Sequence, residues 1–440
     1  MDGMNMKQQL PDAFANRMRT QLNHELPAFL CELDKAPLRG IRINPLKETK
    51  GSMGYTTGEP IAWFPKSFYL DEESPAGATV LHAAGAFYIQ EPAAMIPAAV
   101  LDAKPGENIL DLCAAPGGKS TQIGCAMRGK GILVCNEPIP KRARILSGNI
   151  ERMGIPNAIV TNAWPEKLAE KWPGGFDAVM VDAPCSGEGM FRRDPETRNE
   201  WTPEKADGCA ARQREILTAA AGLVRPGGRL VYSTCTYNPK ENEENADWFC
   251  RSFPDYYREA FFLPGIDAPD GVFTCYPHRL KGEGQFVALF RKRGNGPAVM
   301  NKDCSTPAPS KDCRLLFESS FPQMPFVTHL FGNTLVHIPD LPDISGIKVI
   351  RTGLHLGEIR GRIAVPDHAA AMCFLTPDMQ KLELNPDEIV RYTTGETISG
   401  VNEGWTLICY QGLCIGWGKG SGGTIKNHFP KGLRGIHYIA

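Results

Sequence analysis

The stretch NILDLCAAPGGKS, residues 108–120, decides the fold of this chain. Its apolar first half predicts a buried β-strand, and the small residues that follow lead into a helix beginning at Gly118. Apolar runs and helical patterns alternate through residues 91–293, which is typical of parallel βαβ units. We therefore predict a doubly wound, mostly parallel α/β sheet. Further strands are expected at 131–137, 157–162, 176–184, 227–235 and 284–292, and helices at 138–154, 203–224 and 239–254.

The composition is that of an ordinary soluble globular protein. The 440 residues are 42% hydrophobic and 22% charged with a net charge of −1, which excludes disordered and fibrous classes and favours two or three domains. No window approaches ~18 uninterrupted apolar residues. Asp2, Lys7 and Asp12 also stand where a signal peptide needs an apolar centre. We expect a cytoplasmic protein without a membrane segment.

The 14 cysteines do not form a disulfide or zinc pattern. They are scattered along the chain and include no C-x-x-C pair, so most are expected to be reduced core residues. Cys409 and Cys414 form the nearest late pair, but no second Cys or His pair stands at ligand spacing. We predict no bound metal.

The segments that flank the sheet differ from it in pattern. Residues 1–90 mix a helical start with extended pieces such as RGIRINPL and predict an N-terminal α+β extension. Residues 294–314 are interpreted as a linker, 315–375 as an intermediate segment, and 376–440 as a small β-rich module. Residues 404–440 lack acidic side chains and carry +4, against −5 for the rest. A basic surface suits a phosphate-bearing partner, and a solvated glycine-rich loop is an equally weighted alternative.

Ligands of an open α/β sheet bind beyond the carboxyl ends of its strands. The loop CAAPGGK, residues 113–119, lies at such an end, and its small residues allow a ligand to approach the backbone. A P-loop is excluded because Cys113 stands where that motif needs glycine. Glu137 ends the second strand, 19 residues past Gly118, and can accept both ribose hydroxyls of a nucleoside cofactor. It can equally serve as an acid at the start of the next helix.

Three chemically active side chains follow the fourth and fifth strands. Asp182 and Cys185 end one strand and Cys235 ends the next, so the two thiols are expected to share one cleft. Each cysteine alone is more often an inert core residue, but the pair beside Asp182 indicates thiol chemistry on a bound substrate. His278 is expected to be structural, which leaves a Cys-His hydrolase unsupported.

Five motifs in order resemble one known family. LDLCAAPGGKSTQ, NEPIPKRARIL, VDAPCSGEGMFRRDP, YSTCTYNPKENE and RLKGEGQFVA are similar to the Nop/Sun family of S-adenosylmethionine-dependent RNA cytosine-C5 methyltransferases. The two ends of the chain, including LPDAFANRMRTQL and KNHFPKGLRG, resemble its bacterial RsmF-like branch. The resemblance implies a Rossmann-like class I methyltransferase domain with a PUA-like RNA-binding module at the C-terminus.

The resemblance also implies a mechanism and a set of site residues. Cys235 would add to C6 of cytosine, Cys185 would help release the adduct, and Asp182 would contact the N3 edge of the ring and lie near the cofactor. The predicted contacts to the methionine end of S-adenosylmethionine are Cys113, Ala114, Ala115, Pro116, Gly117, Gly118 and Lys119. Glu137 would hold its ribose and Asn162 its adenine, although the TNAWPE stretch lacks the carboxylate that the family commonly has there.

The implied partner is RNA, most directly 16S ribosomal RNA or the small ribosomal subunit, and the protein is expected to act as a monomer. Its target cytosine must be unpaired or flipped out of a stack. The predicted phosphate contacts are Lys419, Lys426, Lys431 and Arg434. The alternatives are a transfer RNA cytosine-C5 methyltransferase, a non-catalytic RNA-binding factor of ribosome assembly, and a DNA cytosine methyltransferase with Cys185 as the nucleophile.

Overall fold

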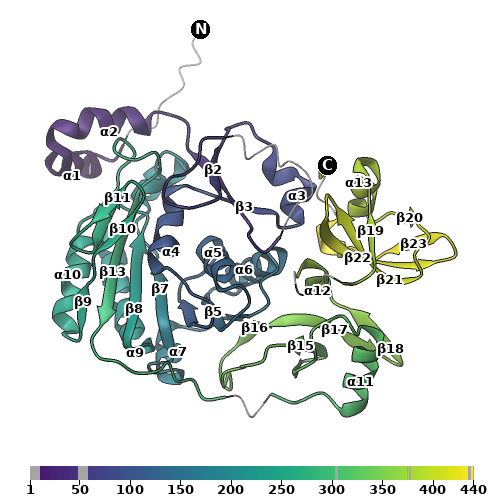
Figure 1. Cartoon of the computed structure of the whole chain (residues 1–440). Helices are drawn as coiled ribbons and strands as arrows, with labels where there is room; N and C mark the ends of the chain where they lie inside the picture. Colours follow the sequence, from purple (N-terminus) through teal and green to yellow (C-terminus); the bar gives the residue numbers. More distant parts are fainter. Residues whose placement is uncertain are drawn as a thin grey trace, which may run out of the picture.

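The structure is a computed structural model that describes residues 10–47, 58–302, 306–373, 375, 378–434 and 438–439. Its centre is a nine-stranded sheet with helices on both faces (Figure 1). Five parallel strands in the order β6-β5-β4-β7-β8 form its middle. The predicted doubly wound α/β sheet is therefore confirmed. The strands are β4 (Asn108–Asp111), β5 (Ile132–Asn136), β6 (Ala158–Thr161), β7 (Phe176–Asp182) and β8 (Val224–Thr234).

Successive residues of each central strand face opposite layers of helices. Ile109 of β4 joins one apolar core and its neighbour Leu110 joins the other. Because both faces are covered, these strands are apolar throughout rather than alternating. One layer contains α4 (Ile96–Leu101), α5 (Gly118–Met127) and α6 (Pro140–Arg152); the other contains α7 (Pro165–Lys171), α9 (Pro203–Leu223) and α10 (Glu243–Ser252).

Four antiparallel strands extend the sheet at its two edges. Beyond β8 lie β13 (Gln285–Lys292), β12 (Val272–Cys275) and β9 (Tyr256–Arg258). Beyond β6 lies β16 (Val349–Thr352), which comes from the C-terminal part of the chain. Arg351 of β16 and His368 both bind Glu151 of α6, so charge pairs reinforce this edge. A small separate hairpin consists of β10 (Phe261–Leu263) and β11 (Ile266–Ala268).

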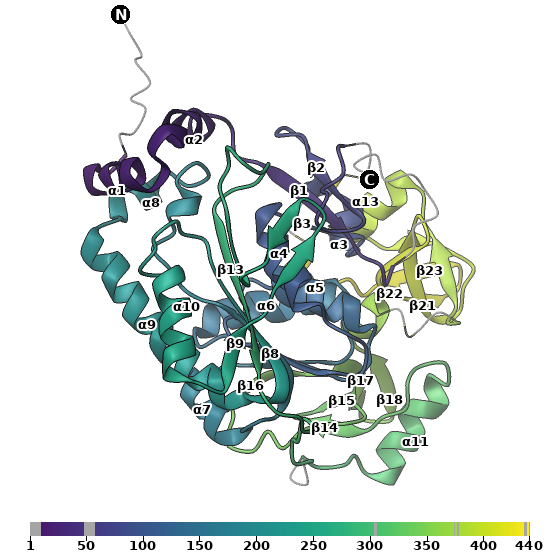
Figure 2. The ribbon, with the colours of Figure 1, turned by 60° about the vertical axis from the view of Figure 1, so that its left-hand side comes forward.

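The N-terminal residues form two helices and a three-stranded sheet. Phe14 of α1 (Asp12–Leu22) and Phe29 of α2 (Leu26–Leu33) pack against Phe191 and Tyr237, which lie in the loops after β7 and β8. Figure 2 shows α1 and α2 beside the short helix α8 (Glu196–Glu200). The sheet has the order β2-β1-β3, with β1 (Arg39–Ile43), β2 (Ser67–Leu70) and β3 (Phe87–Gln90), and α3 (Val80–Ala83) precedes β3.

The C-terminal residues form two further sheets. The first has the order β14-β15-β17-β18 and the second the order β19-β21-β22-β23-β20. The first unit comprises α11 (Lys311–Ser320), β14 (His329–Phe331), β15 (Thr334–His337), β17 (Leu354–Arg360), β18 (Ile363–Pro366) and α12 (His368–Met372). The second comprises β19 (Lys381–Glu383), α13 (Pro386–Thr394), β20 (Ile398–Ser399), β21 (Gly404–Tyr410), β22 (Leu413–Ser421) and β23 (Thr424–Asn427).

Two helices begin at positions that differ from the prediction. Helix α10 begins at Glu243 rather than near Pro239, because Asn238 and Glu241 direct their side chains into a buried polar cluster instead of a helix. Helix α11 begins at Lys311, inside the predicted linker, because the Ser310 side chain accepts a hydrogen bond from the Cys313 N–H and caps it. Among the described residues, no helix is long and apolar enough to cross a membrane.

Candidate active site

The two cysteines predicted to share a cleft lie in direct contact. Cys185 follows β7 and Cys235 follows β8, and their Sγ atoms are 3.2 Å apart. The Cys235 backbone N–H also donates to Cys185 Sγ at 3.3 Å. The hydrogen bond with Cys235, together with burial, raises the pKa of Cys185 well above its usual range. The two sulfur atoms are therefore close enough to share a proton, and either one can be the donor.

Asp182 and Lys119 form an ion pair at the same edge of the sheet. Lys119 Nζ of α5 lies 2.8 Å from Asp182 Oδ2, and Ser233 Oγ donates to Asp182 Oδ1 at 2.7 Å. Burial lowers the pKa of Lys119, but the nearby Asp182 carboxylate outweighs burial and leaves that pKa raised. The lysine is thus a fixed positive charge between the loop after β4 and the loop after β7.

A cavity of about 200 Å³ lies over the loop that follows β4. Among the residues that line it are Cys113, Ala114, Ala115, Pro116, Gly118, Lys119 and Asp182. Gly117 adopts φ +112, where a side chain is strained, and a Cβ atom at Gly118 would lie 3.2 Å from Gln90 Nε2. The two glycines keep the loop close to the start of α5 and leave the space open.

Asp111, Tyr88 and Arg193 also line this cavity, and the sequence prediction missed them. Asp111 is fully buried at the end of β4; Ser120 Oγ donates to its Oδ2 at 2.6 Å, and its Oδ1 has no hydrogen-bond partner among the described residues. Burial raises the pKa of Asp111 to about 7. Its position as the last residue of the first strand was a usable signal, but Tyr88 and Arg193 are brought there by distant segments.

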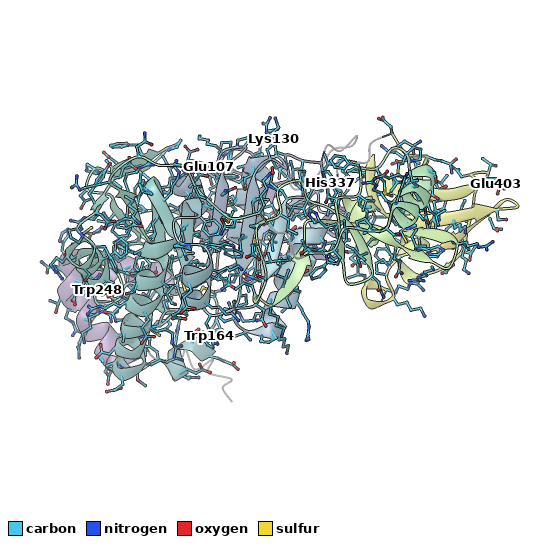
Figure 3. All side chains as sticks on the ribbon, turned by 90° about the horizontal axis from the view of Figure 1, so that it is seen from below. Glu107, Lys130, Trp164, Trp248, His337 and Glu403 are labelled. Atoms are coloured by element: carbon cyan, nitrogen blue, oxygen red, sulfur yellow. The ribbon has the colours of Figure 1, made fainter. Side chains whose placement is uncertain are left out.

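Glu137 and Asn162 lie beside the site rather than in the lining of this cavity. The Glu137 carboxylate accepts from the Ile139 N–H at 3.0 Å and pairs with Arg142 at 3.1 Å. The Asn162 side chain donates to the backbone oxygens of Glu137 and Pro138, both at 2.8 Å. Asn162 therefore joins the loops after β5 and β6. Trp164, which follows in the second loop, is 69% exposed at the surface (Figure 3).

The predicted basic residues near the C-terminus differ in exposure and in hydrogen bonding. Lys419 and Lys426 are exposed neighbours on β22 and β23, and Trp405 of β21 continues the same row. The Lys419 ammonium lies 5.5 Å from the centre of the Trp405 ring. Arg434 instead donates to the Phe429 backbone oxygen at 2.7 Å and to the Asn427 side chain. Lys431 is exposed in the short helical turn that follows Pro430.

Nothing among the described residues resembles a metal site: no group of three or more His, Cys, Asp or Glu side chains converges there. Cys409 and Cys414 face each other across the β21–β22 hairpin with free thiols. His278 is held by Glu25 at 2.9 Å and packs edge-on against Phe29.

Family models match four consecutive segments of the chain. The model for 16S rRNA methyltransferase RsmB/F matches residues 98–291, and the model for the N-terminal domain of RsmF matches 10–92. The RsmF first C-terminal domain matches 317–374 and the RsmF PUA domain matches 379–435. The proteins named ribosomal RNA small subunit methyltransferase F from Escherichia coli K12 and Shigella boydii serotype 18 are 31% identical to this chain, over 96% of its length and 96% of theirs. The chain belongs to the RsmF family.

Solved structures agree with this membership. A methyltransferase homolog protein from Pyrococcus horikoshii is 28% identical with a TM-score of 0.56, over 64% of this chain and 95% of that chain. NSun6 from Pyrococcus horikoshii, solved with SFG, has a TM-score of 0.55 at 21% identity, over 66% of this chain and 100% of that chain, and shares the fold. The expected family, the Rossmann-like methyltransferase domain and the PUA module of this RsmF-family chain are confirmed.

Proposed function

We propose that this RsmF-family protein methylates C5 of a cytosine in RNA, with S-adenosylmethionine as methyl donor, through a covalent adduct between Cys235 and C6 of the base. The observation that carries the proposal is the contact of two thiols at 3.2 Å beside the Asp182–Lys119 ion pair. C5 of cytosine is a weak nucleophile, and a thiolate that adds to C6 converts the ring into an enamine. Covalent catalysis of this kind replaces one difficult step by two easier ones.

The thiol pair supports an assignment of roles. We assign the attack on C6 to Cys235, as the resemblance of the YSTCTYNP motif to the family implies, and the contact of its Sγ atom with Cys185 at 3.2 Å supports a helper role for Cys185. The Cys235 Sγ atom would form the bond to C6, which makes C5 nucleophilic towards the methyl group that S-adenosylmethionine would supply. Loss of the C5 proton and breaking of the Sγ–C6 bond restore aromaticity. Cys185, whose sulfur lies 3.2 Å from that of Cys235, can give its thiol proton to the departing sulfur, and the Cys185 thiolate that results can take the C5 proton.

Asp182 and Lys119 form an ion pair that supports a role for Asp182 in binding the base. The Oδ2 atom of Asp182 is held by Lys119 and its Oδ1 atom by Ser233, so the carboxylate is fixed before substrate arrives. Such preorganisation is where most electrostatic catalysis originates. We assign Asp182 the contact to N3 and Lys119 the task of holding Asp182 beside the cofactor.

The residues present fit S-adenosylmethionine. The cofactor supplies an electrophilic methyl group when bound. The orphaned, buried Oδ1 of Asp111 and the glycine-lined cavity suit the amino-acid end of such a molecule. Cys113, Ala114, Ala115, Pro116, Gly118 and Lys119 would line that end, with Gly117 shaping the turn. Glu137 is proposed for the ribose. Asn162 would act on the adenine side through the loop it holds, since both its donors are engaged by backbone oxygens.

The substrate class is proposed from the family and from the C-terminal surface. Relatives are named for the small ribosomal subunit RNA, and we propose 16S ribosomal RNA as the substrate here. Lys419, Lys426 and the neighbouring Trp405 offer cations and an aromatic ring in one row, the combination that binds phosphates and stacks bases. Lys431 is retained as a phosphate contact, whereas the guanidinium of Arg434 is engaged within the module.

The test compares two cysteine variants on 16S ribosomal RNA with labelled S-adenosylmethionine. Cys235→Ala should abolish methyl transfer, because no thiolate is left to attack C6. Cys185→Ala should retain a protein–RNA adduct that survives a denaturing gel. A Cys235→Ala protein that methylates normally would refute the mechanism, and adduct formation through Cys185 on DNA would favour DNA methylation instead. Bisulfite sequencing of ribosomal and transfer RNA, with and without the gene, decides between the two RNA classes.

A further inference from the structure

A buried carboxylate joins the two loops that carry the cysteines. Glu241 follows β8 by several residues and has no exposed surface. Its Oε2 atom accepts from the Ser186 N–H at 2.9 Å, and its Oε1 atom accepts from Ser186 Oγ at 2.5 Å. Ser186 directly follows Cys185 in the chain. The carboxylate therefore holds the loop after β7 at the residue next to one thiol.

The same cluster reaches the residue next to the other thiol. Ser186 Oγ lies 2.9 Å from Thr236 Oγ1, and Thr236 directly follows Cys235. Both hydroxyls are buried. A chain of short hydrogen bonds thus runs from Glu241 through Ser186 to Thr236 and links the two cysteine loops immediately behind the sulfur atoms.

Glu241 is itself held from three directions. Gln213 Nε2 of α9 donates to its carboxylate at 2.9 Å, and Asn238 Nδ2 donates at 3.4 Å. The Tyr232 hydroxyl, from β8, binds its backbone oxygen. Both carboxylate oxygens of Glu241 accept hydrogen bonds, and a fully satisfied buried network is rigid. This accounts for the late start of α10, since a helix from Pro239 would direct this carboxylate elsewhere.

We propose that Glu241 is a positioning residue for methyl transfer, which sets the separation of Cys185 and Cys235 by holding Ser186 and, through it, Thr236. The expected change in turnover rests on the proposed function. The expected change in the separation of the two sulfur atoms does not. Glu241 touches neither substrate nor cofactor, and it acts on the reaction only through the placement of the two sulfur atoms.

The kinetic test uses Glu241→Gln and Glu241→Ala, with Glu243→Gln as the matched control. Glu243, two residues further on, is half-buried. Its carboxylate accepts from Thr274 Oγ1 of β12 at 3.2 Å, and among the described residues no hydrogen bond joins that carboxylate to either cysteine loop. A displacement of about 1 Å in a reacting group costs about 100-fold in rate. We expect kcat to fall about 100-fold in Glu241→Ala and less in Glu241→Gln, with KM for both substrates within about two-fold of wild type. Glu243→Gln should turn over normally.

The geometric test needs no turnover. Diamide, a two-electron oxidant, takes the two thiol hydrogens and leaves a disulfide, and peptide mapping by mass spectrometry follows the Cys185–Cys235 bond. Wild type and Glu243→Gln should link at the same rate, and Glu241→Ala at least about tenfold more slowly. Glu241→Gln, which keeps the side-chain volume, serves if the alanine variant does not fold. It should lose no further rate when combined with Ser186→Ala, because one network carries both effects.

The outcomes separate the two proposals. Normal turnover and normal cross-linking in folded Glu241 variants would overturn the positioning role and leave the methyltransferase assignment intact. A wild-type protein that transfers no methyl group to RNA would overturn the assignment, while the cross-linking rates would still test Glu241. A fall in the affinity for S-adenosylmethionine that equals the fall in turnover would also overturn the positioning role, because it would indicate a general loss of structure.

Discussion

Replacing Asp111 by asparagine should make the protein more stable at alkaline pH and weaken its hold on the cofactor. Burial raises the pKa of this carboxyl from 3.8 to about 7. The folded state therefore binds a proton that the unfolded chain has released, and stability declines as pH rises from the lower value towards the higher one. Above about pH 7 the carboxylate is charged, buried and without a partner for Oδ1.

The size of the effect follows from those two pKa values. At about 1.4 kcal/mol per pKa unit, the rise from 3.8 to about 7 corresponds to about 4 kcal/mol of stability lost at high pH. Asparagine avoids this loss but leaves a buried amide donor unpaired, which costs about 1–3 kcal/mol. The variant should thus be about 1–3 kcal/mol more stable than wild type at pH 8.5 and less stable than wild type near pH 4, close to the ordinary pKa of 3.8, where little of that loss has yet occurred.

Urea denaturation between about pH 4 and 8.5 measures the crossover, and Asp102→Asn is the control because that carboxylate is 68% exposed. Calorimetry with S-adenosylmethionine completes the assay. If ionised Asp111 pairs with the amino group of the cofactor, wild-type affinity rises through about pH 7 and the affinity of the variant is low and flat. Parallel stability curves for wild type and Asp111→Asn would refute the argument from burial.

The remaining predictions concern the C-terminal units. Trp405→Ala should weaken RNA binding about 5- to 150-fold, the loss of one stacked base, without changing the affinity for S-adenosylmethionine in calorimetry. Lys426→Ala should lower the slope of log K against log salt by about 1 in filter binding at several salt concentrations, and an unchanged slope would remove it from the phosphate contacts. Arg351→Ala leaves Glu151 with His368 alone and should destabilise the protein by about 3 kcal/mol in urea denaturation. A loss below about 1 kcal/mol would show that β16 does not depend on this pair.

Local signals in the chain predicted the central domain well. The five parallel strands and helices α5, α6 and α9 were expected at nearly their observed positions. Buried strands appear in a sequence as short apolar runs, and helices as apolar residues repeated every three to four positions. The placement of Cys185 and Cys235 at one edge also followed, because both strands run in the same direction and end there.

Other features depend on segments that are distant in the chain. No local pattern indicated that β16 would pair with β6. The pairing depends on the unpaired backbone N–H and C=O groups that β6 presents at the edge of the sheet, and these are set by the rest of the fold. Tyr88 and Arg193 reach the cavity from the N-terminal sheet and from the loop after β7. Glu241 was predicted to lie in a helix, but it lies before the start of α10. The groups that hold it there come from three other parts of the fold, which no local pattern reveals.

By itself the sequence determined the order of the central strands and helices, the glycine-containing loop after β4 and the placement of the two cysteines at the ends of β7 and β8, since these depend on residues close together in the chain. The tertiary structure alone decided that the two thiols lie in contact, which carboxylate holds the two cysteine loops together, and that Asp111 is buried with no partner for its Oδ1 atom among the described residues. Each of these depends on desolvation and on hydrogen bonds between residues far apart in the chain. Only folding brings such groups within reach of one another.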